Sequence, residues 1–218
     1  MCSIVGSFKK DKVIELCKLN EYRGCISHSI CYYDIDQPGL FYVCKSYGPL
    51  DYTKLDEEPG MYIIVHQQAP TSDTRRDEFI HPAQLPSDWA LWHNGILKQH
   101  EIERLQKEYD DDCPWDTGLL LLDVWLNYMK LHQIKPSSNI DGSFSCLLSD
   151  LQELYLFRNE IAPMFIDDEM TISSTAFEGS KSTEPNKTFA MNFKEKKLEE
   201  IANFQTFYNP YAFLEDEE

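Results

Sequence analysis

A cysteine stands at the second position of the chain, which begins Met1-Cys2-Ser3. Peptidases that remove the initiator methionine act when the next side chain is small, so Cys2 can become the N-terminal residue. An N-terminal cysteine carries its own base, because a free α-amine with an ordinary pKa of roughly 7.7–8.0 can take the thiol proton. Cys2 is therefore a candidate nucleophile, and an inert N-terminal thiol is the alternative.

Two further positions could complete such a site. Asn94 and Gly95 place an amide side chain beside a flexible backbone N–H. An oxyanion hole needs two preorganised donors aimed at one point, and these two groups would supply them. The same pair is also a common signal for a hairpin turn. Asp116 opens an apolar run and could either pair with a ligand cation or cap a helix N-terminus.

The elements that would position these residues alternate between strands and helices. Helical periodicity predicts helices over residues 13–19, 96–109 and 116–131. Apolar and β-branched runs predict short strands at residues 3–8, 27–33, 39–44, 61–66, 89–93, 143–149, 154–158, 164–166, 171–173 and 188–193. Many short strands with a pair of central helices favour an α+β layered fold.

Composition and charge limit the class of protein. The 218 residues contain no long Pro, Gly or Ser linker, which predicts a single domain over residues 1–218 with a short acidic C-terminal tail. A formal net charge of -17 repels nucleic acid phosphates, so we expect no nucleic acid partner. No run of eighteen apolar residues and no secretory signal are present, so we expect no membrane span.

The cysteines predict a reduced, cytoplasmic setting, because there are seven of them, an odd number without a disulfide framework. Cys25, His28 and Cys31 could suggest metal ligands. On a strand, however, Cys25 and Cys31 would share one face while His28 points to the other. We therefore expect structural cysteines, no metal and no cofactor.

The order of the motifs resembles the glutaminase domain of class II glutamine amidotransferases, which are N-terminal-nucleophile hydrolases. The resemblance covers most of the chain. The segments that carry it are the N-terminal Met1-Cys2-Ser3-Ile4-Val5-Gly6, Tyr22-Arg23-Gly24, the loop from His66 to Thr71, His81-Pro82, His93-Asn94-Gly95, Asp116-Thr117, Asp141-Gly142-Ser143-Phe144, Phe157-Arg158-Asn159 and Ile172-Ser173-Ser174.

The resemblance implies a fold and a reaction. The fold would be an αββα sandwich of two antiparallel sheets between helical layers, with the N-terminal strand central and Cys2 at its exposed end. Cys2 would attack the carboxamide of glutamine or a related amide, form a γ-glutamyl thioester and release ammonia. Asn94 and Gly95 would hold the oxyanion, and Asp116 would pair with the substrate α-ammonium.

The resemblance also implies the pocket wall and a partner. Ala69 and Thr71 would contribute backbone and hydroxyl contacts, and His81 would close the rim. Such domains pass ammonia to a synthetase or transferase domain, and the length of this chain leads us to expect such an enzyme in trans. Without that partner the chain would act as a bare amidohydrolase.

Gln68 stands where the family carries an arginine that clamps the substrate α-carboxylate. Glutamine donates hydrogen bonds but has neither the charge nor the fork of a guanidinium. Arg75 or Arg76 could supply the charge, free glutamine could bind weakly, or the substrate could lack that carboxylate. Two alternatives therefore stand beside the glutaminase: an amidohydrolase acting on a different amide, and a catalytically inert acidic binding protein.

We predict that Gln68→Arg separates use of free glutamine from the other functions. A charge-assisted fork should lower KM for glutamine roughly ten- to a hundredfold, because hydrogen bonds to charged groups contribute about 1.5–3 kcal/mol. Steady-state kinetics beside the parent enzyme measures the change. An unchanged or higher KM contradicts free glutamine as the substrate.

Overall fold

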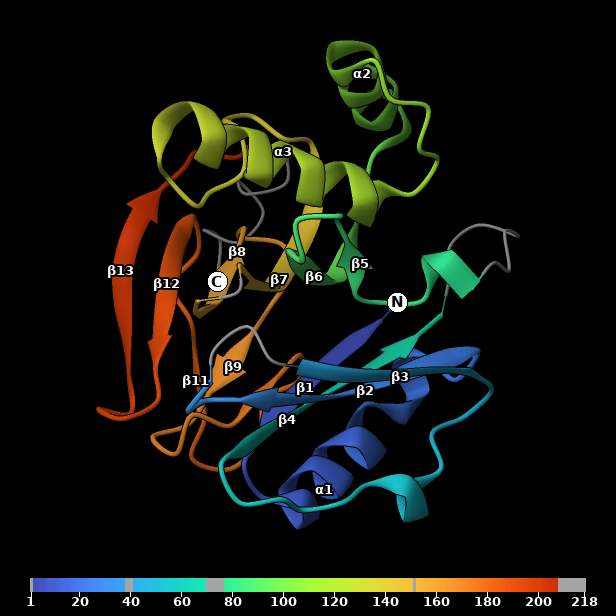
Figure 1. The fold of residues 1–218 in the computed structure, drawn as a ribbon, viewed down its shortest axis with the longest axis vertical. Helices are drawn as coiled ribbons and strands as arrows, with labels where there is room; N and C mark the ends of the chain where they lie inside the picture. The colour runs from blue at the N-terminus through green and yellow to red at the C-terminus, as the bar shows by residue number, and fades with distance from the viewer. Residues whose placement is uncertain (1, 38–40, 70–76, 151, 208–218) are drawn as a thin grey trace, which may run out of the picture.

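Two antiparallel β-sheets are stacked face to face, with helices covering the outer face of each (Figure 1). The computed structural model describes residues 2–37, 41–69, 77–150 and 152–207. The layers confirm the αββα sandwich that the resemblance implied.

The first sheet has the strand order β11-β9-β10-β1-β4-β2-β3, which places the N-terminal strand fourth of seven. Its strands are β1 (Ser3–Ser7), β2 (Ser27–Asp34), β3 (Phe41–Tyr47), β4 (Met61–Gln68), β9 (Phe165–Ile166), β10 (Ile172–Ser173) and β11 (Lys181–Ser182). β1 pairs with β4 on one side, where Ile4 lies opposite His66, and with β10 on the other, where Val5 lies opposite Ser173. The predicted central position of this strand is confirmed.

The second sheet has the order β13-β12-β8-β7-β6-β5. Its strands are β5 (Ala83–Gln84), β6 (Ala90–Leu97), β7 (Gly142–Ser149), β8 (Leu154–Arg158), β12 (Lys187–Asn192) and β13 (Lys197–Asn203). Asn94 lies opposite Ser145 and Gly95 opposite Phe144 in the pairing of β6 with β7. The interpretation of Asn94-Gly95 as a hairpin turn is therefore wrong, because both residues lie inside a paired strand.

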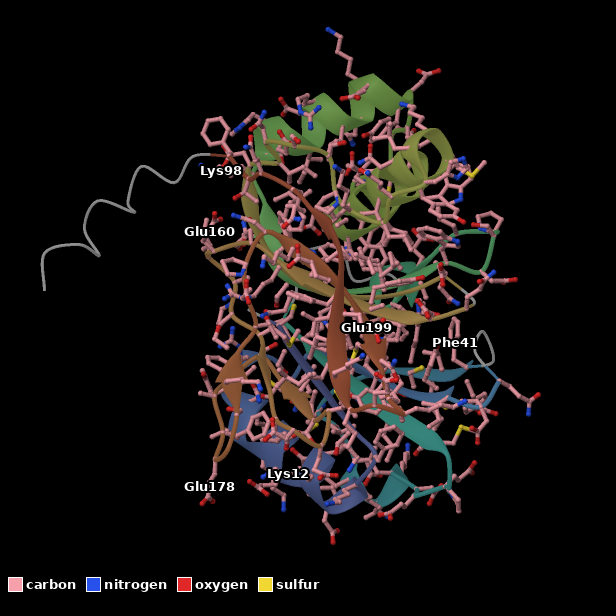
Figure 2. All side chains as sticks on the ribbon, turned by 90° about the vertical axis from the view of Figure 1, so that its left-hand side faces the viewer. Lys12, Phe41, Lys98, Glu160, Glu178 and Glu199 are labelled. Atoms are coloured by element: carbon pink, nitrogen blue, oxygen red, sulfur yellow. The ribbon has the colours of Figure 1, made fainter. Side chains whose placement is uncertain are left out.

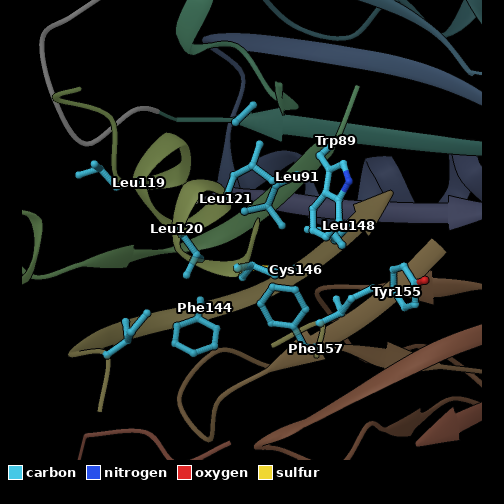
Figure 3. Close-up of a cluster of buried hydrophobic side chains, with 14 of the residues drawn as sticks. Trp89, Leu91, Leu119, Leu120, Leu121, Phe144, Cys146, Leu148, Tyr155 and Phe157 are labelled. Atoms are coloured by element: carbon cyan, nitrogen blue, oxygen red, sulfur yellow. The ribbon is translucent and has the colours of Figure 1, made fainter. Parts of the chain in front are cut away.

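Each outer face is covered by helices that bury one apolar stripe. α1 (Lys10–Asn20) packs Val13, Leu16 and Cys17 against the first sheet. α2 (Gln99–Tyr109) and α3 (Asp116–Leu131) cover the second sheet, and α3 has the predicted bounds. Three leucines of α3, Leu119, Leu120 and Leu121, belong to one apolar cluster with Leu91, Phe144, Cys146 and Leu148 of the second sheet (Figure 3). Among the described residues, no helix combines the length and apolar composition needed to cross a membrane.

A third apolar cluster lies between the sheets and joins them. It contains Ile4 from β1, Ile64 from β4 and Trp92 from β6, all with essentially no exposed surface. Successive residues of a strand point to opposite faces, so the same strands also contribute to the two outer clusters. Because Ile4 packs against the second sheet, the position of Cys2, two residues before it, is fixed relative to both sheets.

The sequence reasoning missed the short or polar strands. β5 and β11 have two residues each, too few to show an alternating pattern. β13 is an edge strand in which most residues are exposed. Three turns of 3-10 helix, at Glu21–Arg23, Tyr52–Lys54 and Asp77–Phe79, were also not expected.

We predict that Leu121→Ala lowers the free energy of unfolding by roughly 2–5 kcal/mol, because it leaves a cavity between α3 and the second sheet. Leu121 is fully buried. Leu131, at the end of the same helix, is 56% exposed, and Leu131→Ala should stay within about 0.5 kcal/mol. Denaturant unfolding of both variants measures the difference. Equal losses would contradict the packing of α3 described above.

Candidate active site

A cavity of about 390 Å³ opens where the ends of β4 and β6 meet the starts of α2 and α3. Six of the predicted site residues line it: Cys2, Gln68, Ala69, His81, Gly95 and Asp116. The other lining residues are Phe79, His93, Ile96, Leu97, Lys98, Gln99, Ile102, Pro114, Trp115 and Thr117. Thr71, Arg75 and Arg76 lie outside the described residues.

Cys2 sits directly before β1 and is held by two neighbouring segments. Its thiol donates to the carbonyl oxygen of Ala69 at 3.9 Å, and the Nε of Arg23 donates to the Cys2 carbonyl oxygen at 3.0 Å. Although the resemblance implied an exposed strand end, Cys2 is only 8% exposed. This burial raises the pKa of the thiol, and the hydrogen bond to Ala69 opposes the shift in part. The thiol therefore needs a base before it can attack.

Gly95 and Asn94 lie on opposite faces of β6. Gly95 lines the cavity, with a φ of 156°, and a Cβ there would lie 1.9 Å from the carbonyl oxygen of Ser143. Only glycine therefore fits at this position. Asn94 shares the inter-sheet side with Trp92 and donates from Nδ2 to Ser145 Oγ at 3.5 Å. Asn94 does not line the cavity, so its role as an oxyanion donor stays a prediction.

Asp116 is the first residue of α3 and ties this helix to β6. Its Oδ1 accepts a hydrogen bond from the backbone N–H of Thr117 at 2.8 Å, and its Oδ2 accepts from that of Leu97 at 3.2 Å. The interpretation of Asp116 as the helix N-cap is wrong, because Trp115 occupies that position. The carboxylate is instead oriented at the cavity wall, where it can meet a cationic ligand group.

The side chain of Gln68 is buried and forms hydrogen bonds inside the protein. It is 5% exposed, and its Nε2 donates to the carbonyl oxygen of Phe79 at 2.9 Å. Its Oε1 accepts from Ser27 Oγ at 3.3 Å and lies 3.2 Å from His81 Nδ1. Gln68 therefore positions neighbouring residues, and an arginine at this position would have to give up these contacts.

Three buried histidines surround the inner wall of the cavity. The rings of His66 and His81 are stacked with centroids 3.8 Å apart, and His66 Nε2 lies 2.9 Å from the carbonyl oxygen of His93. Burial lowers the pKa of His66 to about 3 and that of His81 well below its ordinary value. The sequence reasoning singled out only His81. In the sequence, the indication that His93 and Thr117 belong to the site was that each is next to a candidate residue, His93 to Asn94 and Thr117 to Asp116.

No group of three or more His, Cys, Asp or Glu side chains that could hold a metal ion occurs in the described part of the chain. Cys31 is buried between the sheets, whereas Cys25 is exposed and precedes β2. His28 contacts the carbonyl oxygen of Gly48 through Nδ1 at 2.9 Å. These three residues therefore have separate structural surroundings.

We predict that His66 makes the protein less stable in acid. Its folded-state pKa of about 3 lies below the ordinary value of about 6.5, so between these values only the unfolded chain binds the proton. Its contribution is complete above pH 6.5 and is lost as the pH falls, by about 1.4 kcal/mol per pH unit. Denaturant unfolding from pH 7 to pH 5 should show a shallower dependence for His66→Gln than for the parent. His132→Asn, at an exposed histidine, should keep the parental slope, and equal slopes for all three proteins would contradict the prediction.

No protein-family model and no curated protein matches this sequence. Solved structures do share its fold. The glutamine phosphoribosylpyrophosphate amidotransferase from B. subtilis, complexed with ADP and GMP, superposes with a TM-score of 0.62 and 16% identity over 93% of this chain and 49% of that chain. A structure described as the allosteric regulatory enzyme of purine biosynthesis superposes with a TM-score of 0.63 and 16% identity over 94% of this chain and 50% of that chain.

The chain thus spans about half the length of these two solved proteins. At this level of identity the likeness concerns the fold alone. The chain therefore has the two-sheet fold of these two solved proteins, one of which is described as an amidotransferase, and the predicted fold is confirmed.

Proposed function

We propose that this chain hydrolyses a carboxamide of the glutamine type through Cys2. One observation carries the proposal: the candidate nucleophile directly precedes the central strand β1 and lines a cavity that Gly95 and Asp116 also line. An N-terminal nucleophile is held rigidly there, because the strand that follows it is fully buried and paired on both sides.

The reaction requires removal of Met1. The α-amine of Cys2 then takes the thiol proton, and the sulfur attacks the carboxamide carbon. The C–N bond breaks, the nitrogen leaves as ammonia with the transferred proton, and a thioester remains. Water cleaves the thioester to the acid and regenerates the thiol. The backbone N–H of Gly95 and the side chain of Asn94 would stabilise the oxyanion, and Asp116 would receive the substrate ammonium.

The same proposal includes the cellular compartment and the enzyme that receives the ammonia. The chain is proposed to act as one domain in the cytoplasm and to supply ammonia to a synthetase or transferase in trans. The support is that the chain matches about half of each of the two solved proteins, one of which is described as an amidotransferase.

A second candidate is hydrolysis of an amide that lacks the free carboxylate of glutamine. The contacts of Gln68 with Phe79, Ser27 and His81 favour it, because they hold this uncharged side chain inside the protein, where it supplies no positive charge for a ligand carboxylate. In this case the apolar part of the wall, which includes Trp115 and Ile102, would contact the rest of the substrate.

We predict that a diazoketone analogue of glutamine labels Cys2. Intact mass and peptide mapping should show a chain without Met1 that carries one adduct on Cys2, together with lost glutaminase activity. Cys2→Ala should abolish both labelling and turnover and keep the fold. Cys25→Ala, at an exposed cysteine, serves as the matched control and should react like the parent.

The possible outcomes separate the functions. Turnover that survives in Cys2→Ala would exclude the N-terminal-nucleophile mechanism. Failure of the glutamine analogue, with Cys2-dependent hydrolysis of an uncharged primary amide, would favour the second candidate. A chain that retains Met1 and reacts with neither probe would be an inert binding protein on this fold.

A further inference from the structure

The cavity wall carries two charged side chains of opposite sign, and they differ in how far they are neutralised. Lys98 is the one lysine or arginine among the described residues that line the cavity, and its Nζ lies 2.9 Å from Asp141 Oδ1. Asp116 is the one carboxylate among the same residues, and its hydrogen-bond partners in the described part of the chain are uncharged groups. A ligand in the cavity therefore meets a negative charge at Asp116, whereas the positive charge of Lys98 is already paired.

The carboxylate of Asp116 is held in place and keeps an acceptor site for a ligand. Its Oδ1 accepts from the backbone N–H of Thr117 at 2.8 Å and from the Thr117 hydroxyl at 3.4 Å, and its Oδ2 accepts from the backbone N–H of Leu97 at 3.2 Å. Because a carboxylate has about four lone-pair sites, one site remains on Oδ2. A protonated amine is the ligand group that matches this site best, since it supplies both a donor and the opposite charge.

The backbone of Gly95 faces the cavity on the same side as Asp116. Leu97 directs its N–H to Asp116, and alternate residues of an antiparallel strand direct their backbone groups to the same edge, so Gly95 shares the edge of Leu97. Among the described residues, β5 pairs with β6 only as far along as Leu91. The N–H and the carbonyl oxygen of Gly95 are therefore directed to the space that a ligand would fill, which Gly95 lines.

Gln68 presents an uncharged amide in the same wall. Its Nε2 donates to the carbonyl oxygen of Phe79 at 2.9 Å, and its Oε1 accepts from Ser27 Oγ at 3.3 Å. A free carboxylate on the ligand would lie beside Asp116 without a described counter-charge, and taking an unpaired charge out of water is costly. The carbonyl oxygen of a peptide bond needs only a neutral partner. The wall therefore favours a ligand that carries an ammonium group and whose carboxyl group is part of an amide bond.

The cavity opens to solvent along an apolar rim. Ile96, which is 45% exposed, and Pro114, which is also exposed, both line the cavity. Lys98, next to them in the wall, is labelled at the edge of the molecule in Figure 2. Ile102 and Trp115 are partly buried and complete the apolar part of the wall. A ligand chain can therefore leave the cavity over apolar side chains.

We propose that the substrate of this site is the N-terminal glutamine residue of a peptide or protein. Its α-ammonium pairs with Asp116, and its side-chain carboxamide meets Cys2 and the N–H of Gly95. Its carboxyl group continues as a peptide bond past the neutral Gln68, and the next side chain contacts the apolar rim. This inference rests on the proposed hydrolysis through Cys2 and names the class of substrate that undergoes it.

The product is the same chain with glutamate as its first residue. The sulfur of Cys2 attacks the side-chain carboxamide carbon, the C–N bond breaks, and ammonia leaves with the proton that the thiol gave up. Water then breaks the C–S bond of the thioester, which yields the carboxylic acid and returns a proton to the sulfur. The peptide bonds of the substrate stay intact.

Two related amides fit the cavity less well. Glutamine inside a chain has its nitrogen in a peptide bond and so has no ammonium for Asp116. Free glutamine has the ammonium but brings a carboxylate into a wall whose uncompensated charge is negative.

The direct test compares kcat/KM of the full chain for three probes, measured as ammonia release: glutaminyl-leucine methylamide, its N-acetyl form and free glutamine. The first should exceed each of the others roughly ten- to a hundredfold, the range expected for one charge-assisted hydrogen bond. Glutaminyl-aspartate methylamide should be severalfold poorer than the leucine form, because its side chain gains nothing from the apolar rim. Cys2→Ala provides the blank, since N-terminal glutamine also loses ammonia by spontaneous cyclisation.

A variant pair tests the role of Asp116. Asp116→Asn removes the charge and keeps one acceptor oxygen, so the preference for the free-amine peptide over its N-acetyl form should fall towards one. Asp112→Asn, at an exposed aspartate outside the cavity wall, should keep the parental preference. Purely structural damage would lower turnover of both peptides alike and leave their ratio unchanged, and that result would contradict the pairing with Asp116.

The parent enzyme alone decides the inference, even if Asp116→Asn fails to fold. An equal or higher kcat/KM for free glutamine would overturn the peptide substrate and leave hydrolysis through Cys2 standing. Equal turnover of the N-acetyl peptide would overturn recognition of the ammonium. If none of the three probes loses ammonia faster than in the Cys2→Ala blank, the proposed function falls together with this inference.

Discussion

The burial of β1 at the centre of the first sheet is the constraint on which the rest of the molecule depends. This strand is paired on both sides, and Ile4 packs against the second sheet through the apolar cluster that contains Trp92. A strand held from three directions cannot shift by one residue without exchanging its buried faces. The position of Cys2 is therefore determined by the packing of apolar residues, and its chemistry is separate from that packing.

Part of the cavity wall beside Cys2 is formed by polar groups that satisfy one another. Asp116 accepts backbone N–H groups from Thr117 and Leu97, and Gln68 is held by Phe79 and Ser27. Because a buried polar atom without a partner costs roughly 1–3 kcal/mol, such a wall is rigid as long as its network is complete. This rigidity is the property that an oxyanion site needs, since donors must be aimed before charge develops.

The glycine at position 95 shows how a motif can acquire its meaning only from its surroundings. In isolation Asn94-Gly95 indicates a turn, and only the surrounding motifs suggest an oxyanion pair. In the structure the absence of a Cβ lets the Ser143 carbonyl approach His93 and the cavity wall. A sequence window of five residues cannot include Ser143, which is brought there by the pairing of β6 with β7.

The sequence by itself determined the layers and the order of the candidate residues. The apolar stretch of α3 and the alternating strands predicted an α+β layered fold, because secondary structure follows from local periodicity. The two-sheet arrangement and the order of the candidate residues came from the resemblance of the sequence motifs to class II glutamine amidotransferases. The tertiary structure alone decided that Gln68 is held by internal hydrogen bonds, that Asn94 turns toward Ser145, and that Thr117 contacts both His81 and His93. Those contacts join residues far apart in the chain, and hydrogen bonds between such residues depend on atomic positions that no local pattern encodes.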